Sequence, residues 1–515
     1  MKALSKLSIA LLSAGLMFGA QAADITVAFD ADPVSLDPHE QLSGGTMQMA
    51  HISFDPIVRF TQDLGFEARL AEKWERVNDT TMRFHLRKGV KFHSGNELTS
   101  KDVEWTFNRI MTSPDFKAIF APFKQINVVD DYTFELETHI PYPLMLQSLA
   151  HLFPMDSQFY SGTDANGQDK GALVKHGSTF ASTNLSGTGP FIVKYREQGV
   201  KIEYVRNPNY WDKGSDGNVD NMTLVPIKES GTRVAALLSG DVDMISPVAP
   251  TDHKRVKSTK GIDLVTMGGT RAITFQLNQN TNPALKDVRV RQAIIHAIDN
   301  VGIAKKVMRG FATPTNQLSP KGYAGYNDSL TTRYDLKKAK QLMQEAGYAD
   351  GFKMTMIAPN NRYTNDKNIA QAVAAMLAKI GVKVDVKTMP KAQYWPEYDL
   401  CKADMQMIGW HPDTEDSANF MEYLVMSRDA KTGFGQYNCS YSNPELDKLV
   451  VEANKATDEA VRSKLLQQAE KLAYDDAALV PLHYENLAWG ASDKLDIAPI
   501  VNQINMPYFG DLVVK

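Results

Sequence analysis

One stretch in the second half of the chain gathers side chains that could do chemistry. It reads MQMIGWHPDTEDSANF, from Met405 to Phe420, and crowds a tryptophan, a histidine and three acids into a few residues. Imidazole and carboxylate groups are common metal ligands. The same groups can move a proton, and a carboxylate can form a charge-assisted hydrogen bond with a cation. The residue types alone leave a metal, a proton and a positively charged ligand open.

Motifs of known enzyme classes are missing from the rest of the sequence. There is no H-E-x-x-H zinc pattern, no G-x-x-x-x-G-K-[ST] phosphate loop and no G-x-S-x-G nucleophile elbow. An exported hydrolase that cleaves peptides would need a nucleophile–base pair or a metal triad, and the sequence offers neither pattern. We therefore expect a protein that is not an enzyme and that has no resident metal or cofactor.

The first residues have the pattern of a secretory signal. Lys2 and Lys6 precede an apolar run from Leu7 to Phe18, and AQA at 20–22 supplies the small residues of a cleavage site. The apolar run is shorter than the roughly 20 residues needed to span a bilayer. We predict cleavage after Ala22 and an exported chain.

The net charge of the chain argues against a nucleic-acid-binding protein. The formal net charge of the whole chain is −4, and removal of the two leader lysines makes it −6. A nucleic-acid-binding protein would instead show a clustered basic surface.

The two cysteines, Cys401 and Cys439, have no C-x-x-C spacing. Export makes a disulfide between them possible, but the sequence does not place their Cα atoms within bridging distance.

Strand and helix patterns alternate along the chain, which predicts an α/β fold of two or three domains. Thr99 followed by Asp102 forms a capping box that should begin a helix with Val103, Phe107 and Ile110 on its apolar face. The predicted strands cover 24–30, 81–92, two segments around a Gln-Gly turn within 188–211, and 382–389. The predicted helices cover 232–240, 287–299, 335–347, 368–381, 444–456 and 460–477.

Several blocks of the sequence closely resemble the extracellular solute-binding proteins that serve peptide and nickel ABC importers. The longest runs from Leu70 to Ile110. The others, in order, are SLDPH (35–39), GTGPF (187–191), RNPNYW (206–211), LLSGDVDM (237–244), DVRVRQAIIHAID (287–299), GFATP (310–314) and YDLKKAKQLMQEAGYADGF (334–352). Together they span nearly the whole mature chain, and their number and order make the resemblance specific.

The resemblance implies a two-lobed periplasmic binding protein fold, with hinge strands and an extra domain inserted in the first lobe. By analogy, domain I is discontinuous and consists of residues 23–65, 186–284 and 490–515. Domain II, the inserted domain, would cover 66–185. Domain III, the second lobe, would cover 285–489, and closure would be a hinge motion around an enclosed ligand.

The resemblance also gives the acidic stretch a role. Peptide-binding relatives have a Gly-Trp pair, two further residues and then an aspartate that holds the α-ammonium group of the ligand. Asp413 occupies that position here, with Trp410 as a flat apolar wall. The alternative for Asp413 is an acid that caps the next helix, a role we expect for Glu415 and Asp416. A metal site that includes His411 would need more distant ligands that the sequence does not reveal.

Other positions follow from the same resemblance. Dipeptide-binding relatives bind the ligand carboxylate with an arginine after the strand that follows the AGYxxGF block, and Arg362 falls there. The spacing from Arg362 to Asp413 is slightly shorter than in those relatives, so a solvated loop arginine stays an alternative. Gly44 and Gly45 lie where relatives present their backbone to the ligand, and they would permit close approach.

The resemblance thus implies a periplasmic receptor, expected to be a monomer, that hands a di- or oligopeptide to an ABC permease and its ATPase. A non-peptide solute is the alternative ligand: an opine, a nickel chelate, haem or an oligosaccharide. An exported peptide hydrolase is the alternative from another class, and a chaperone or adhesin, which would need exposed apolar patches, is a third.

Overall fold

The computed structural model describes residues 23–515 except 33–34, 43, 176, 413 and 415. The predicted leader at 1–22 lies outside the described residues, and so do Asp413 and Glu415. Within the described ranges, no helix has the length and apolar character needed to cross a membrane.

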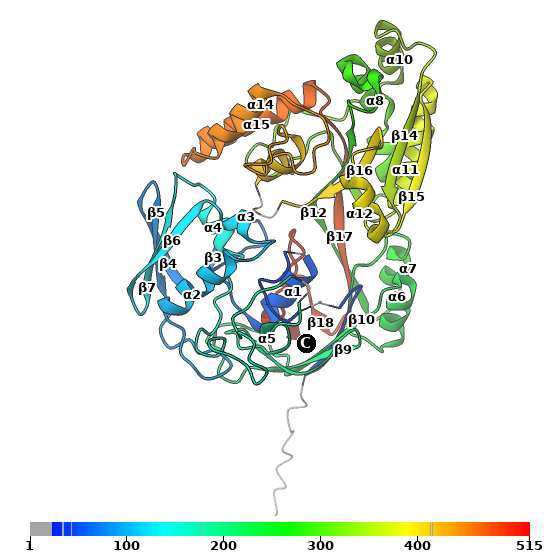
Figure 1. Ribbon diagram of the computed structural model, residues 1–515. Helices are drawn as coiled ribbons and strands as arrows, with labels where there is room; N and C mark the ends of the chain where they lie inside the picture. Colours follow the sequence, from blue (N-terminus) through cyan, green and yellow to red (C-terminus); the bar gives the residue numbers. More distant parts are fainter. Residues whose placement is uncertain (1–22, 33–34, 43, 176, 413, 415) are drawn as a thin grey trace, which may run out of the picture.

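A single mixed sheet of eleven strands runs through the molecule (Figure 1). Its order is β15-β14-β16-β12-β17-β11-β1-β10-β9-β8, with β13 paired to β17. The strands are β1 (Asp24–Phe29), β8 (Phe191–Glu197), β9 (Lys201–Arg206), β10 (Asn221–Pro226), β11 (Met244–Ser246), β12 (Ile262–Leu277), β13 (Ala312–Pro314), β14 (Lys353–Pro359), β15 (Lys383–Met389), β16 (Met405–Trp410) and β17 (Leu479–Ser492).

The sheet has two parts that share the long antiparallel pair β12 and β17. On one side β1 is parallel to β10 and β11, and β11 pairs with the end of β17. On the other side β14 is parallel to β15 and β16, and β16 pairs with the second half of β12. We call the part around β1 the first lobe and the part around β14 the second lobe. The pair β12–β17 therefore carries the chain between them.

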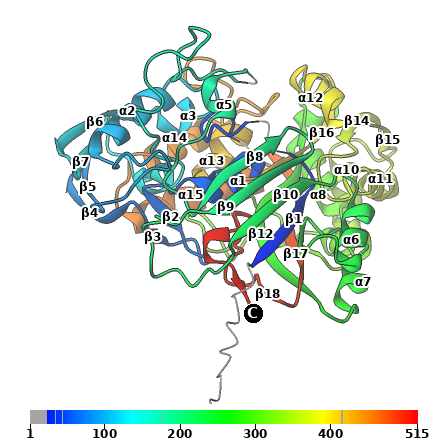
Figure 2. The ribbon, with the colours of Figure 1, turned by 90° about the horizontal axis from the view of Figure 1, so that it is seen from below.

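Helices cover both parts of the sheet (Figure 2). In the first lobe α6 (Ser230–Ser239) packs on β11 and β17, and α7 (His253–Lys257) on β12. In the second lobe α11 (Asp366–Leu377) lies on β14 and β15. The other second-lobe helices are α8 (Val288–Ala297), α9 (Asn300–Gly302), α10 (Leu336–Glu345), α12 (Lys391–Asp399), α13 (Ser417–Phe420), α14 (Pro444–Ala453) and α15 (Glu459–Asp475).

The expected helix ends are confirmed where capping residues define them. Asp287 and Asp335 cap α8 and α10 by accepting backbone N–H bonds, and Gly240 ends α6 in the left-handed region with φ 82°. Gly199 forms the expected turn between β8 and β9 with φ 77°.

A second sheet of four strands, in the order β4-β5-β7-β6, stands beside the first lobe. Its strands are β4 (Ala71–Asn78), β5 (Thr81–Leu86), β6 (Phe123–Asp130) and β7 (Thr133–Thr138), and α2 (Ser100–Ile110) packs against β6. The capping box of Thr99 and Asp102 is present at the start of α2, as predicted. The predicted strand over 81–92 is too long: β5 ends at Leu86, and the chain turns at Gly89 with φ 74°.

Smaller elements surround this sheet. They are α1 (Gly44–Ser53), α3 (Lys117–Phe120), α4 (Met145–Leu149), α5 (Phe180–Thr183) and the hairpin β2 (Val58–Phe60) with β3 (Phe66–Ala68); β18 (Leu495–Asp496) pairs with β19 (Val513–Val514) near the end of the chain. At the tip of the β2–β3 hairpin, Leu64 contacts both the aromatic core of the four-stranded sheet and a core of the second lobe. The hairpin tip is therefore a point where the second lobe meets the rest of the molecule.

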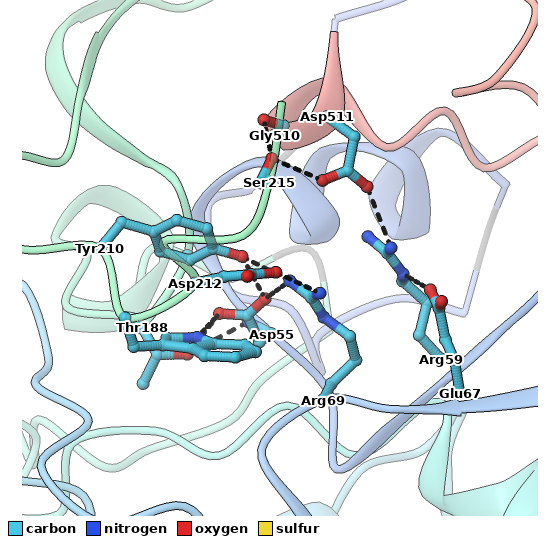
Figure 3. Close-up of polar contacts among 12 residues, drawn as sticks. Asp55, Arg59, Glu67, Arg69, Thr188, Tyr210, Asp212, Ser215, Gly510 and Asp511 are labelled. Atoms are coloured by element: carbon cyan, nitrogen blue, oxygen red, sulfur yellow. Dashed lines mark hydrogen bonds and ion pairs between the residues drawn. The ribbon is translucent and has the colours of Figure 1, made fainter. Parts of the chain in front are cut away.

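A buried polar network around Asp55 joins the blocks that carry the family resemblance (Figure 3). Asp55 pairs with Arg69 at 3.0 Å, and both side chains are nearly inaccessible to water. Tyr210 and Trp211 donate to Asp55 at 3.0 and 2.9 Å, and the Thr188 hydroxyl does so at 3.2 Å. The blocks GTGPF and RNPNYW therefore contribute to the buried frame of the molecule.

The disulfide that the sequence left open is formed. Cys401 and Cys439 are bonded, with their Cα atoms 5.6 Å apart, within the range that a disulfide can bridge. The bond closes a loop of the second lobe that begins just before β16.

Candidate functional site

Two loops of the second lobe leave the same edge of the sheet. β14 ends at Pro359 and β16 at Trp410, and the two strands are parallel, with Met356 opposite Met405. In open α/β sheets, ligands bind where the carboxyl ends of parallel strands release their loops. The segments 360–366, which contains Arg362, and 411–416, which contains His411 and Asp413, are therefore candidate ligand loops. We call them the Arg362 loop and the Asp413 loop.

Tyr363 connects the Arg362 loop to β16, the strand that leads into the Asp413 loop. Its hydroxyl donates to the carbonyl oxygen of Gly409 at 3.2 Å, and its side chain is buried. Asp366 holds the start of the Arg362 loop because its Oδ2 accepts the N–H groups of Arg362 and Tyr363, at 2.9 and 3.1 Å. The predicted neighbourhood of Arg362 and the Gly-Trp pair thus has a direct structural link.

Trp410 lies in a group of three aromatic rings. Its ring centroid is 4.9 Å from that of Tyr423, which it stacks on, and 5.2 Å from that of Tyr437. Its indole N–H donates to Oδ1 of Asn419 at 2.7 Å. Because its polar atom is bonded and its ring is packed, Trp410 is held as a rigid apolar surface, as a ligand wall requires.

His411 is held as a neutral imidazole. Burial lowers its pKa to about 3, and the charges of Arg271 and His151 act in the same direction. Its Nδ1 shares a hydrogen bond of 2.7 Å with the hydroxyl of Thr270 on β12. That hydroxyl belongs to a residue that is 1% exposed, and an imidazole with so low a pKa is a weak general base. The hydrogen bond therefore ties the start of the Asp413 loop to β12.

A metal site is not found among the residues that the structure describes, because no three of their histidine, cysteine, aspartate or glutamate side chains are placed to share an ion. Asp413 and Glu415 are outside that set.

Asp416 has the predicted capping role: its Oδ1 accepts the N–H of Ala418 at 2.8 Å at the start of α13. It also forms a buried ion pair of 2.6 Å with Arg462 of α15, which fixes the end of the Asp413 loop.

Arg362 is exposed, and its guanidinium lies 5.0 Å from the centroid of the Tyr363 ring. Nearby, on the strands that connect the lobes, Arg271 and Glu485 pair at 3.3 Å. Glu485 also accepts the N–H of Thr364 in the Arg362 loop at 3.0 Å. The loop is therefore ordered through its backbone, while the Arg362 side chain extends from it toward solvent.

Gly44 and Gly45 begin a helix. They form the first turn of α1, which lies between the four-stranded sheet and the strands of the first lobe (Figure 1). A Cβ atom added at Gly45 would meet no atom within 4 Å. Packing within the protein therefore does not explain a glycine at this position.

His151 acts electrostatically on one histidine of α1 and on one of the second lobe. The pKa of His51 on α1 is well below its ordinary value, through burial and then through the charges of Arg59, His151 and Arg69. His151 also acts on His411 of the second lobe.

A surface hollow of about 390 Å³ lies elsewhere, at the amino ends of β14 and β15. It is lined by Lys353, Met354, Thr355, Lys383, Val384, Asp385 and Asp404. Asp404 already accepts the N–H and hydroxyl of Thr355, at 2.8 and 3.1 Å. The hollow is on the edge of the sheet opposite the two loops, so we do not assign the ligand to it.

Several residues of the site were not predicted. Tyr363, Tyr423 and Tyr437 were missed because an aromatic residue in a loop or on a helix gives no signal of its own. Thr270 and Glu485 were missed because they lie far from 405–420 in sequence. Gly268-Gly269 within a strand is a pattern typical of a bulge, and it could have indicated Thr270.

Comparison with known proteins identifies the family. The model of the bacterial extracellular solute-binding proteins, family 5 (Middle) matches residues 65–432. The chain is 32% identical to heme-binding protein A of Haemophilus influenzae, over 81% of this chain and 78% of that protein. It is 28% identical to the dipeptide-binding protein of Escherichia coli, over 93% of this chain and 92% of that protein.

A solved structure agrees over nearly the full length. The periplasmic binding protein DppA of Helicobacter pylori, in complex with the peptide STSA, is 26% identical and superposes with a TM-score of 0.79. The match covers 96% of this chain and 98% of that one. The predicted two-lobed α/β fold is therefore confirmed, and the chain belongs to the bacterial extracellular solute-binding proteins, family 5.

Proposed function

We propose that this protein is the substrate-binding component of an ABC importer and captures a di- or oligopeptide between its two lobes. The observation that carries the proposal is the junction of the Arg362 loop and the Asp413 loop. Both leave the carboxyl edge of the second lobe, and Tyr363 of the Arg362 loop bonds the carbonyl oxygen of Gly409 in β16, the strand that leads into the Asp413 loop.

The proposed contacts divide the peptide between its two charged ends. Asp413 would bind the α-ammonium group and Arg362 the carboxylate, with Trp410 and its two tyrosines as an apolar wall for a side chain. A guanidinium binds a carboxylate through two parallel hydrogen bonds. An ammonium–carboxylate pair in an enclosed site is strong because little water competes with it. Gly44 and Gly45 would let the ligand approach the first turn of α1, and His411 would line the site as a neutral group.

The domain division that accompanies this function is the one implied by the sequence. Domain I would comprise 23–65, 186–284 and 490–515, domain II 66–185 and domain III 285–489. Ligand binding would shift the population toward a closed form, which the permease and its ATPase would recognise. The protein would act as a monomer in the periplasm after cleavage behind Ala22, and it would make or break no bond in the peptide.

Native mass spectrometry of the protein as purified, followed by calorimetric titration with the dipeptide Met-Leu, tests the proposal. We expect a co-purified mass that corresponds to a short peptide. We expect Asp413→Asn to raise the Kd for Met-Leu by at least about tenfold, or 1.4 kcal/mol. Unchanged affinity in that variant would remove Asp413 from the site, and a wild-type protein that binds neither dipeptides nor longer peptides would overturn the proposal.

Haem is the second candidate ligand, because the relative from Haemophilus influenzae is described as a haem-binding protein. A retained haem would give a strong visible absorption band and its own mass in the same experiment. Incubation with mixed peptides addresses the alternative of a hydrolase, since the appearance of fragments would contradict a pure binding role.

A further inference from the structure

The strands that connect the lobes contain a bulge at their midpoint. β12 and β17 pair residue by residue up to Gly268 opposite Asn486, and pairing resumes with Ala272 opposite Tyr484. Residues 269–271 of β12 therefore stand opposite Glu485 alone. A Cβ atom at Gly269 would lie 2.5 Å from the carbonyl oxygen of Glu485, so only glycine fits there. We call residues 269–271 the hinge bulge.

Each of the two ligand loops is bonded at this bulge. The hydroxyl of Thr270 shares its 2.7 Å hydrogen bond with His411, the first residue of the Asp413 loop. Arg271 pairs with Glu485 through Nε at 3.3 Å. The other carboxylate oxygen of Glu485 accepts the N–H of Thr364, in the Arg362 loop, at 3.0 Å.

These contacts are shielded from water. Thr270 is 1% exposed, and the side chain of Glu485 is 14% exposed. Hydrogen bonds and ion pairs in such surroundings are stronger than on the open surface, and salt screens them less. The bonds between the bulge and the loops are therefore able to transmit a change in geometry.

A bulge also changes the geometry of its strand. It interrupts the hydrogen-bond ladder, bends the strand and increases its twist. Hinge motion between lobes is absorbed by a few residues that change their φ and ψ angles. We infer that the hinge bulge, together with Glu485, is a positioning device that couples the two ligand loops to the opening and closing of the lobes. This inference rests on the proposed function, since it assigns a coupling role within the same site.

The coupling acts in both directions. Bending at residues 269–271 moves Thr270 and Glu485, and with them the Asp413 loop and the Arg362 loop. A peptide that fixes both loops restricts the bulge and so favours the closed arrangement, because a ligand shifts an equilibrium by its differential affinity for the two states. Glu485 and Thr270 are positioning residues in this scheme and do not have to touch the ligand.

The test uses Thr270→Val, which keeps the shape of the side chain but removes the hydroxyl, and Glu485→Gln, which removes the charge. Fluorescent dyes at Val200→Cys in the first lobe and Val461→Cys on α15 report the distance between the lobes, and both positions are exposed. Thr266→Val is the matched control because it makes the same substitution on β12 in an exposed position away from the bulge.

We expect both variants to broaden the interlobe distance distribution without ligand and to raise the Kd for Met-Leu by about fivefold or more. Thr270→Ser, which restores a hydroxyl, should recover most of the affinity, whereas a merely structural defect would lower the unfolding midpoint as well. Wild-type distance distributions and affinities in Thr270→Val and Glu485→Gln would overturn the inference. If the wild type binds no peptide, the proposed function fails, while the distance distributions of the unliganded variants still decide the coupling.

Discussion

The ring of Tyr363 occupies the space beside Gly409 that any side chain at position 409 would need. A Cβ atom built there would lie 2.6 Å from Cε1 of Tyr363 and 2.6 Å from Cδ1 of Ile273. The Tyr363 hydroxyl simultaneously bonds the carbonyl oxygen of Gly409. The glycine before Trp410 is therefore required by the close approach of Tyr363 and Ile273 and not by its backbone conformation.

Gly409→Ala should separate the two loops. We expect a loss of about 1–3 kcal/mol in the free energy of unfolding, the usual cost of an extra methyl group in a packed interior, and a weaker affinity for peptide. Urea denaturation and calorimetric titration measure the two effects.

Gly45→Ala provides the contrast. Its Cβ meets open space, and alanine is about 1 kcal/mol more favourable than glycine inside a helix, so stability should be unchanged or slightly higher. If the ligand backbone approaches this turn of α1, the affinity of Gly45→Ala should fall although its stability does not. Equal effects of the two variants on stability would contradict the assigned packing.

Asp55→Asn should be among the most destabilising conservative substitutions in the chain. It leaves the buried guanidinium of Arg69 with Asp212 as its remaining ion-pair partner, and it weakens the bonds from Tyr210 and Trp211. Removing one partner of a buried ion pair costs roughly 3–5 kcal/mol, and because Asp212 remains we expect about 3 kcal/mol by urea denaturation.

The matched control is Glu452→Gln, which breaks the exposed pair with Lys448 at 3.8 Å. Exposed pairs contribute about 0–1 kcal/mol, so its unfolding midpoint should stay close to that of the wild type. A loss of similar size in both variants would show that the network around Asp55 does not hold the frame.

Stability should depend on pH through Glu470. Burial raises the pKa of this α15 carboxyl to about 7, despite the hydrogen bonds that it accepts from Ser319. The folded state thus binds the proton more tightly than the unfolded state, and stability should fall as pH rises from about 4.5 to 7. The full effect is on the order of 3 kcal/mol.

Buried histidines change stability in the opposite direction. Burial lowers the pKa of His411 to about 3 and that of His483 to about 4, so the folded state resists their protonation and loses stability on acidification below pH 6.5.

Comparison of Glu470→Gln with the wild type isolates the contribution of Glu470 to the pH dependence of stability. The stability difference between the two should shift in favour of the variant between pH 4.5 and 7, and a constant difference across that range would rule out the raised pKa. Glu459→Gln, exposed at the start of the same helix, is the control.

Removal of the disulfide should lower stability without changing the fold. Cys401 and Cys439 are separated by 38 residues, and the loop-closure relation gives about 4 kcal/mol for a loop of that size. The double variant Cys401→Ser/Cys439→Ser should therefore unfold at lower urea concentration. The wild type in the presence of a reductant should behave in the same way, and a reductant that leaves the unfolding midpoint unchanged would contradict the assignment.

The local patterns in the sequence predicted seven of the helices, α2, α6, α8, α10, α11, α14 and α15, and several of these carry explicit signals at their ends. Asp287, Asp335 and the pair Thr99–Asp102 satisfy backbone groups that any helix leaves unpaired, and these signals depend only on neighbouring residues. The strand predicted over 81–92 was too long because alternation of side chains continues through a turn at Gly89.

The site was only partly predictable for a different reason. Trp410 and Arg362 follow from the resemblance, and Asp416 from its capping pattern. The contacts that hold them come from Tyr363, Thr270, Glu485 and Arg462, which are brought there by the order of strands in the sheet. A single sequence contains no information on which distant residues face one another, so these partners appear only when β12, β14, β16 and β17 are seen side by side.

The arrangement of the chain ends has a consequence for biogenesis. β1, the first strand, lies inside the sheet between β10 and β11, and Ile504, Met506 and Tyr508 from the last residues fill the aromatic core beside the four-stranded sheet. The hydrophobic interior of that half cannot be completed until the final residues have left the ribosome. Contacts between such remote segments also form slowly. Folding of this half therefore depends on segments from both ends of the sequence.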